Sequence, residues 1–454
     1  MFVEFSVENY RSFKERVTLS MVAANNIRSR SEALDEHDEH KVFSAGPGLE
    51  LLTSAAVYGA NASGKSNLIR GLDFMRMFVL NSSRETQITE AIPVEPFLLS
   101  TATEDQPSLF EIVFLTDDTQ YRYGFAVHRQ GVVSEWLYRL GKSREMRLFE
   151  RDRDAIKVNA RNFPEGQELE KRTRPNALFL SVVAQFNGRI ATRILRWFNR
   201  LIVNTGIDDR ALSLFFAVTS FEQSSYREDI EQFIRRLDVG IERFLTERRP
   251  ALFAIPKNMP KELAAFVETL NQRIKGPEQI RIRTFHRRFN AADQPQDEVL
   301  FDLEEQESEG TQRLFVLAYP FLRTLRQGSV LVIDEMDARL HPNLVTELIR
   351  LFHSVKTNPN QAQLVFTTHN TNLLSAQLFR RDQVWFVEKS RRGASDLYSL
   401  VEYRTDNQKI VRNDAPFEKD YVMGRYGAIP FIGNLDELLG VGVGQESQGS
   451  IEGA

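Results

Sequence analysis

Short apolar runs and amphipathic stretches alternate along the whole chain. Near its start, Phe2, Phe5 and Val7 are interleaved with polar residues, a period-two pattern that predicts a half-buried strand, and residues 17–22 predict its hairpin partner. Three further alternating runs occupy residues 109–115, 121–127 and 132–140, with a turn sequence between the first two. Together they predict an antiparallel β-subdomain.

Other runs are apolar throughout, which is typical of strands buried on both faces of a sheet. Buried strands are predicted at residues 51–58, 330–333 and 363–369, and further strands at 280–285, 299–303, 384–387 and 397–401. Helical periodicity marks residues 68–75, 189–240, 261–275, 314–325 and 344–356.

These runs predict an α/β fold whose sheet is built from two halves of the chain. We expect a first half at residues 1–188, which includes the β-subdomain, an inserted helical lobe at 189–276, and a second half at 277–439. The remaining residues, 440–454, are rich in Gly and Ser and are predicted to be a disordered tail.

A glycine-rich loop follows the first buried strand. Gly59, Gly64, Lys65 and Ser66 have the spacing G-x-x-x-x-G-K-S between a strand and a helix, which is the phosphate-binding P-loop pattern. Its backbone N–H groups surround one anion at a helix N-terminus, its lysine neutralises phosphate charge, and its serine ligates Mg²⁺. The predicted nucleotide-binding residues of this loop are Gly59, Asn61, Gly64, Lys65, Ser66 and Asn67.

Two other buried strands end in residues suited to phosphate chemistry. Asp334 and Glu335 directly follow the strand at 330–333, and a parallel sheet binds ligands at the carboxyl ends of its strands. We predict that Asp334, with Ser66, holds Mg²⁺ and that Glu335 is catalytic and polarises the attacking water. His369 ends the strand at 363–369 and is predicted to be a catalytic sensor of the γ-phosphate.

A second anion-binding pattern precedes the helix at 314–325. Ser308 and Gly310 can present a hydroxyl and a backbone N–H at a helix start, although an ordinary helix N-cap is the competing interpretation. Because the P-loop already provides one phosphate site, we expect this second set to bind nucleotide held by another copy of the chain.

The order P-loop, serine–glycine signature, Asp-Glu strand, Asp337 and His369 resembles the ABC, SMC and RecF ATPases. Asn67, the opening ENYRSF and the sequence DEMDARLHP at 334–342 resemble the RecF and OLD branch. Residues 1–435, including GRYGAIP at 424–430, are most similar to stand-alone ATPases of bacterial abortive-infection, anti-phage systems.

That resemblance implies an ABC-type P-loop ATPase head with an antiparallel β-subdomain and an inserted helical lobe. It implies ATP and Mg²⁺ as cofactors, and a D-loop role for Asp337 across a dimer interface. It also implies a homodimer or higher homo-oligomer with composite sites, and a separate effector protein.

The chain departs from the family pattern at two places. Its signature, SEGTQ, lacks a double glycine, and no glutamine is evident for the usual contact to Mg²⁺. Gln185, after an apolar run at 177–181, is the candidate, with an ordinary polar loop residue as the alternative. No Asp-x-Asp follows Glu388, and the one at 152–154 lies in a charged segment, so we expect no intrinsic nuclease.

Composition narrows the class of protein further. The net charge is −4 and cysteine is absent, which excludes disulfides and cysteine metal sites. No apolar run approaches about 18 residues and the N-terminus does not resemble a signal peptide, so we expect a cytoplasmic protein without a membrane span. Two histidines among four acids at 35–40 are interpreted as a solvated loop rather than a metal site.

Two basic clusters leave nucleic-acid binding open, with solvated, acid-balanced faces as the favoured interpretation. They comprise Arg281, Arg283, Arg287 and Arg288, and Lys142, Arg144, Arg147, Arg151 and Arg153. The function we expect is slow Mg²⁺-dependent ATP hydrolysis that controls a separate effector in anti-phage defence. The alternatives are a RecF-like DNA-binding repair ATPase and an ATP-locked scaffold that barely turns over.

Overall fold

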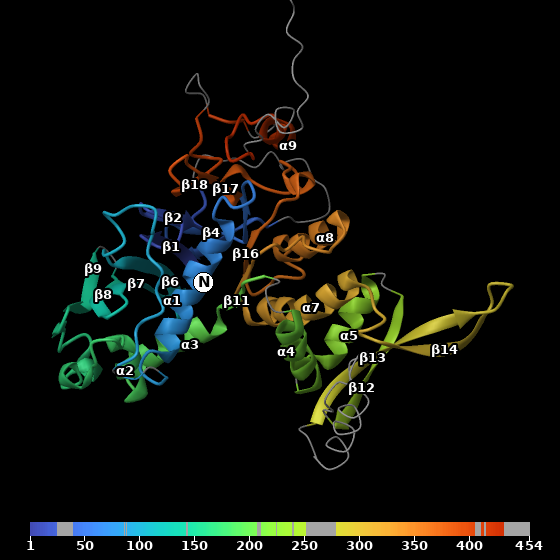
Figure 1. Ribbon diagram of the computed structural model, residues 1–454, viewed down its shortest axis with the longest axis horizontal. Coiled ribbons are helices and arrows are strands. Elements are labelled where there is room, and N and C mark those ends of the chain that lie inside the picture. Colours follow the sequence, from blue (N-terminus) through green and yellow to red (C-terminus); the bar gives the residue numbers. More distant parts are fainter. Residues whose placement is uncertain are drawn as a thin grey trace, which may run out of the picture.

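Figure 1 shows the computed structural model of the chain. It describes residues 1–24, 40–85, 87, 89–141, 144–206, 210–223, 225–237, 240–250, 278–404, 410–412 and 415–430. The tail at 440–454, the helical run at 261–275 and most of the charged loop at 35–40 lie outside the described residues. Within the described part of the chain, no helix is long and apolar enough to cross a bilayer.

A seven-stranded antiparallel sheet has the strand order β10-β9-β8-β7-β6-β1-β2. In chain order the strands are β1 (Phe2–Glu8), β2 (Val17–Ser20), β6 (Ser108–Thr116), β7 (Thr119–His128), β8 (Gly131–Leu140), β9 (Glu145–Asp152) and β10 (Ala155–Val158). The predicted hairpin is present, with Phe5 opposite Leu19. The three alternating runs form the β6–β7–β8 meander, so the predicted antiparallel β-subdomain is confirmed.

The second large sheet has the order β11-β15-β16-β5-β17-β18. Its strands are β5 (Ser54–Tyr58), β11 (Ile202–Asn204), β15 (Val330–Ile333), β16 (Gln363–Thr367), β17 (Val384–Lys389) and β18 (Ser395–Ser399). The first five in spatial order are parallel and β18 is antiparallel to β17. The single strand predicted over 51–58 is in fact two, because Leu52 ends β4 (Leu49–Leu52), which pairs with β3 (Val42–Gly46).

Helices cover both faces of this parallel sheet. The described helices are α1 (Lys65–Asn81), α2 (Phe179–Gln185), α3 (Arg189–Arg200), α4 (Arg210–Gln223), α5 (Arg227–Arg236), α7 (Glu309–Gln327), α8 (Pro342–His353) and α9 (Phe417–Val422), of which α4 and α5 pack on α7. Short 3₁₀ turns lie at Pro164–Gly166, Glu170–Arg172, Thr371–Leu373 and Arg381–Gln383.

Alternate residues of β5 show how the core is divided by the sheet. Ala55 and Val57 belong to a cluster that contains α1, α3 and the antiparallel sheet. Ala56 and Tyr58 belong to a second cluster with α7, α8 and α9. Because both faces of the parallel sheet are buried, its strands read as continuous apolar runs, and only their ends can carry polar side chains.

The lobe predicted to be helical over 189–276 differs from the structure at two places. Leu201 and Ile202 continue the helical spacing of α3, but Ile202 instead begins β11, which pairs in parallel with β15. This tertiary pairing, together with β-branching at Ile202 and Val203, overrides the helical period. The second strand is β12 (Ile241–Pro250), and the domain boundaries themselves stay a prediction.

A three-stranded antiparallel sheet joins β12 to β13 (Glu278–Phe289) and β14 (Pro295–Asp302). Its β13–β14 hairpin projects away from the two large sheets (Figure 1). The arginines predicted here as a basic cluster are paired with acids, for example Arg283 with Glu247 and Arg288 with Asp297. The acid-balanced interpretation of this cluster therefore agrees with the structure.

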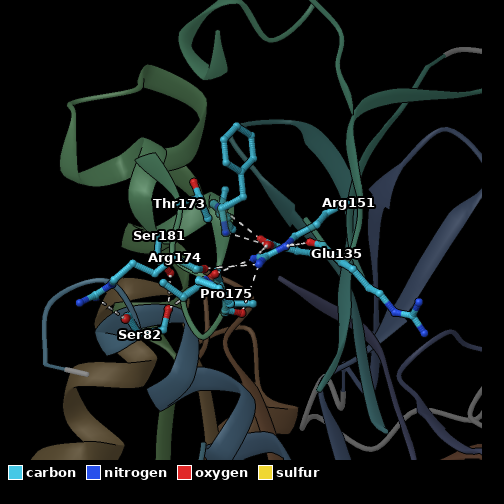
Figure 2. A network of polar contacts seen from close by, with 12 residues as sticks. Ser82, Glu135, Arg151, Thr173, Arg174, Pro175 and Ser181 are labelled. Atoms are coloured by element: carbon cyan, nitrogen blue, oxygen red, sulfur yellow. Dashed lines mark hydrogen bonds and ion pairs between the residues drawn. The ribbon is translucent and has the colours of Figure 1, made fainter. Parts of the chain in front are cut away.

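A buried polar network connects the antiparallel sheet to the end of α1 (Figure 2). The Glu135 carboxylate on β8 accepts from the backbone N–H groups of Phe179 (2.7 Å) and Leu180 (3.0 Å) at the start of α2. Arg151 on β9 donates to the carbonyls of residues 174, 175 and 177 in the segment before α2. These bonds satisfy backbone groups that would otherwise be buried without partners.

The same segment is bound to the C-terminal end of α1. The Leu178 N–H donates to the Ser82 hydroxyl (3.2 Å), and the Ser181 hydroxyl donates to the Val79 carbonyl (2.6 Å; Figure 2). The network therefore holds the far end of the helix whose first residue is Lys65.

Candidate functional site

The predicted site residues converge on one edge of the parallel sheet. β16 lies between β5 and β15, and in register Val57 is opposite Thr367, while Phe366 is opposite Ile333. The chain leaves these three strands into the P-loop, into Asp334-Glu335 and into Thr368-His369. Because the strands are parallel, all three segments emerge at the carboxyl edge, where α/β sheets bind ligands.

The P-loop backbone depends on its glycines. Gly64, directly before α1, has φ +118°, and a Cβ there would lie 2.5 Å from the Ser395 hydroxyl and 2.7 Å from that of Ser12. Gly59 has φ +155°, and a Cβ on it would overlap the Val387 carbonyl. A side chain at either position is therefore excluded both by conformation and by space.

Lys65 is the first residue of α1 and is buried. Its ammonium group donates to the carbonyls of Gly59 (2.8 Å) and Ala60 (2.9 Å), so it lies inside the loop. Burial lowers the pKa of Lys65 to about 8, opposed by the negative charges of Asp334, Glu335 and Asp337. A buried cation held only by carbonyls is suited to receive an anionic ligand.

The remaining P-loop residues have different environments. Asn61 is exposed on the loop, and Ser66 is half-buried one residue into α1. The Asn67 amide, predicted to bind nucleotide, donates instead to the Ser12 hydroxyl (2.8 Å). Asn67 thus ties the helix start to the ENYRSF segment, which is also where the Ser395 N–H donates to the Ser12 carbonyl.

Asp334 and Glu335 are held from the neighbouring strand. The Asp334 side chain is buried, and its Oδ1 accepts from the Thr367 hydroxyl (2.5 Å). Glu335 has φ +49°, in the left-handed region that non-glycine residues seldom occupy. Such backbone strain is concentrated at functional sites and persists only where surrounding bonds hold it.

His369 follows β16 and is exposed to solvent. Burial lowers its pKa, and the positive charge of Lys65 lowers it further, which places His369 within electrostatic range of the P-loop. A neutral imidazole can both donate and accept a hydrogen bond. The pairing of β16 with β5 brings His369 to the same sheet edge as the P-loop, and its role toward the γ-phosphate stays a prediction.

The signature residues lie at the start of α7. The Ser308 hydroxyl accepts from the Thr311 N–H (3.1 Å), so the ordinary N-cap interpretation is realised. Ser308 and Glu309 are nevertheless exposed to solvent. Gly310 lies against the D-loop of the same chain, because a Cβ on it would be 2.9 Å from the Arg339 carbonyl.

Asp337 is half-buried, and its Oδ1 is buried without a hydrogen-bond partner in the described part of the chain. The pKa of Tyr58, the residue before the P-loop, is raised by burial and then by the Asp337 charge. Asp337 therefore lies near the P-loop of its own chain as well as on the D-loop.

Sequence reasoning missed three residues beside Asp334. The Asn204 carbonyl at the end of β11 accepts from the Asp334 N–H (2.8 Å), and a Cβ on Gly206 would lie 3.6 Å from Asp334 Oδ2. Arg313, buried on α7, donates to the carbonyls of Asp334 (3.5 Å) and Glu335 (3.3 Å). The only sequence signal was indirect: Asn204-Thr205-Gly206 is a turn sequence after a short apolar run.

Gln185, the candidate for the Mg²⁺-contacting glutamine, is not brought to the P-loop. It is exposed at the end of α2, and α2 begins beside Ser82 at the C-terminal end of α1. With 17 residues, α1 separates that point from the P-loop by about 25 Å. The prediction failed because a lone glutamine after an apolar run carries no information on which strand it follows.

The other sequence candidates do not form a site in the described residues. Asp152 and Asp154 are exposed, and no cluster of three or more His, Asp or Glu residues suited to a metal occurs there. In the second basic cluster, Arg151 belongs to the buried network and Arg147 pairs with Glu150.

The arrangement fits a Mg²⁺-nucleotide. Lys65 and the N–H groups at the start of α1 would hold the phosphates, and the buried Ser63 hydroxyl has no partner among the described residues. Ser66 and the free Oδ2 of Asp334 provide hard oxygen ligands of the type that Mg²⁺ prefers.

Comparison with known proteins supports a nucleotide-binding protein. A family model described as "AAA domain, putative AbiEii toxin, Type IV TA system" matches residues 54–375, which include the P-loop, the signature, Asp334-Glu335 and His369. No curated protein matches the chain.

Two solved structures show a distant likeness. The SMC head domain from Thermotoga maritima is 15% identical, with a TM-score of 0.37, over 88% of this chain and 98% of that one. The structure of the recombination mediator protein RecF with ATP is 14% identical, with a TM-score of 0.32, over 87% of this chain and 97% of that one. The matched family model spans more than half of the sequence, and the chain therefore belongs to this AAA-domain family of P-loop ATPases, which its description links to type IV toxin–antitoxin systems.

Proposed function

We propose that the protein binds ATP with Mg²⁺ and hydrolyses it slowly in sites shared by two copies of the chain, and that this cycle controls a separate effector protein. The observation that carries the proposal is the meeting of the P-loop, Asp334-Glu335 and His369 at the carboxyl edge of one parallel sheet. The P-loop serves binding, and hydrolysis needs all three, which the adjacent parallel strands β5, β16 and β15 bring to one edge.

Each residue has a role that follows from its environment. Lys65, buried and held by loop carbonyls, neutralises the β- and γ-phosphates, and His369 hydrogen-bonds to the γ-phosphate. Glu335 orients and polarises the attacking water, which is activated only when its carboxylate is held in place. Ser66 and Asp334 would hold Mg²⁺, which would supply positive charge to stabilise the transferring phosphoryl group.

The proposal of a site shared by two copies is based on the signature residues Ser308 and Gly310. Ser308 and Glu309 are exposed at the N-terminus of α7, whereas Gly310 packs on the D-loop. This helix end is exposed, and a helix N-terminus favours an anion. A nucleotide held by a second copy is the ligand that this geometry suits, with Asp337 at the interface between the copies.

Control of an effector is supported by the family description, which names a toxin–antitoxin system. On the same link between ATPase and toxin, we propose that the controlled effector acts in defence against phage. A RecF-like role on DNA receives less support, because the arginines of β13 that suggested it are engaged in ion pairs.

The test measures ATPase rate and particle mass together, with and without duplex DNA. The variants are Glu335→Gln and the matched control Glu347→Gln, an exposed glutamate on α8. We expect Mg²⁺-dependent turnover in wild type and control, and a loss of about 10²–10⁴-fold in Glu335→Gln with ATP binding retained. ATP should also shift Glu335→Gln to the mass of a dimer or larger assembly.

Three outcomes would change the proposal. A protein that does not bind ATP refutes it outright. Acceleration of turnover several-fold by DNA would replace effector control by a repair-like function. Full effector control by Glu335→Gln would indicate an ATP-locked scaffold rather than a turnover machine.

A further inference from the structure

Thr367, the last residue of β16, makes hydrogen bonds to two functional residues with one side chain. It is fully buried, and the register of β15 against β16 places Asp334 beside it. Its hydroxyl donates to Asp334 Oδ1 (2.5 Å) and accepts from the Glu335 N–H (2.8 Å). A hydroxyl has one donor and two acceptor positions, so both bonds form at once.

The first bond orients the metal-binding carboxylate. Asp334 is buried, and the Thr367 hydroxyl is the one side-chain hydrogen-bond partner that the described residues give to its carboxylate. A short O–H···O⁻ bond of this kind is charge-assisted. With Oδ1 held by Thr367, Oδ2 is directed to the side of the β11 turn, where Gly206 leaves space.

The second bond holds the strained backbone of the catalytic residue. The left-handed φ of +49° at Glu335 is unfavourable for a residue with a side chain, so it persists only where hydrogen bonds hold it. Thr367 contributes two, because its carbonyl also accepts from the Met336 N–H (3.1 Å). The backbone between these bonds has little freedom to relax.

We propose that Thr367 is the positioning residue of this ATPase: its hydroxyl fixes Asp334 for Mg²⁺ and Glu335 for the attacking water. This inference rests on the proposed function and concerns how its two carboxylates are aligned. It predicts that loss of the Thr367 hydroxyl lowers the rate of hydrolysis and weakens Mg²⁺ binding. It should leave phosphate binding unchanged, because the P-loop binds the phosphates.

The experiment compares Thr367→Val, which keeps the shape and removes the hydroxyl, with Thr367→Ser, which keeps the hydroxyl. The matched control is Thr324→Val on α7: Thr324 is equally buried, but its hydroxyl has no partner among the described residues. For each full-length protein we measure kcat, the Mg²⁺ concentration at half-maximal rate, and ATP affinity in EDTA.

Thr367→Val should lower kcat and raise the Mg²⁺ requirement by about 10–100-fold, the usual effect of losing a partner of a metal ligand. Its ATP affinity without Mg²⁺ should stay within about twofold of wild type, because the P-loop contacts are unchanged. Thr367→Ser should recover most of the activity, and Thr324→Val should behave as wild type.

Two results overturn the inference. One is a Thr367→Val protein with wild-type kcat and Mg²⁺ requirement. The other is loss of its ATP affinity in EDTA, which would mean that Thr367 supports the fold of the sheet edge.

Failure of the proposed function is distinguishable from these. If wild type binds ATP without turning it over, hydrolysis fails, and Thr367 is then tested through the Mg²⁺ dependence of binding to a non-hydrolysable ATP analogue. An identical dependence in Thr367→Val and Thr367→Ser would overturn the inference, as would a wild-type protein that binds no ATP.

Discussion

Replacing Arg151 by methionine should destabilise the protein strongly, although Arg151 is far from the nucleotide site. The Arg151 side chain is 2% exposed and that of Glu135 is 0% exposed, with 4.0 Å between Nη1 and Oε2. Methionine of similar length leaves Glu135 as a buried charge without its cation, and removes charged donors from several backbone carbonyls. Breaking a buried pair from one side costs about 3–5 kcal/mol, and we expect a loss in that range.

The pH dependence of the stability loss shows whether the unpaired Glu135 charge causes it. Burial raises the pKa of Glu135 above its usual value of 4.5, and the charge of Arg151 opposes this rise. In Arg151→Met the pKa of Glu135 in the folded state rises further, while the unfolded value is unchanged. The folded state then binds more protons, so the variant regains stability as pH falls, by about 1.4 kcal/mol per unit between the two pKa values.

The assay is urea unfolding followed by circular dichroism at pH 5.5 and 8.0. The deficit of Arg151→Met should be smaller at pH 5.5, and the double variant with Glu135→Gln should lose less than the sum of the single variants. Arg147→Met, on the same strand but exposed and paired with Glu150, is the control and should change stability by less than about 1 kcal/mol. A deficit below about 1 kcal/mol in Arg151→Met, or one equal at both pH values, would refute the reasoning.

Two further predictions concern buried titratable groups. Because burial lowers the pKa of Lys65 to about 8, ATP affinity measured by calorimetry should fall as pH rises above about 8. The affinity of Lys65→Arg should not change with pH over this range, because arginine stays charged. An equally steep fall in Lys65→Arg would assign the effect to another group. His353 is buried beside the Ser54 hydroxyl, and burial lowers its pKa to about 3 from 6.5. Its contribution to stability is therefore complete above pH 6.5 and is lost as pH falls toward 3. The urea midpoint of His353→Phe should depend less on pH across that window than the midpoint of wild type. Midpoints that change in parallel with pH in the two proteins would contradict this.

Much of the fold followed from local patterns. Period-two alternation predicted β1, β2 and the β6–β8 meander because one face of that sheet is buried and the other is more polar. Continuous apolar runs predicted β5, β15 and β16 for the opposite reason, since both of their faces are covered. The errors at β11 and at the break before β5 occurred where three to five residues are too few to show a period.

The chain by itself determined the candidate residues for the proposed chemistry. The P-loop with Lys65, the Asp334-Glu335 pair and His369 lie in short motifs whose backbone context is local. Only the tertiary structure decided what surrounds them. Strand order puts β16 between β5 and β15, gives Asp334 and Glu335 the hydroxyl of Thr367, and leaves Gln185 at the wrong end of α1. Pairing between strands separated by tens or hundreds of residues depends on the packing of the whole core, and such long-range contacts have no periodic trace in the sequence around either partner.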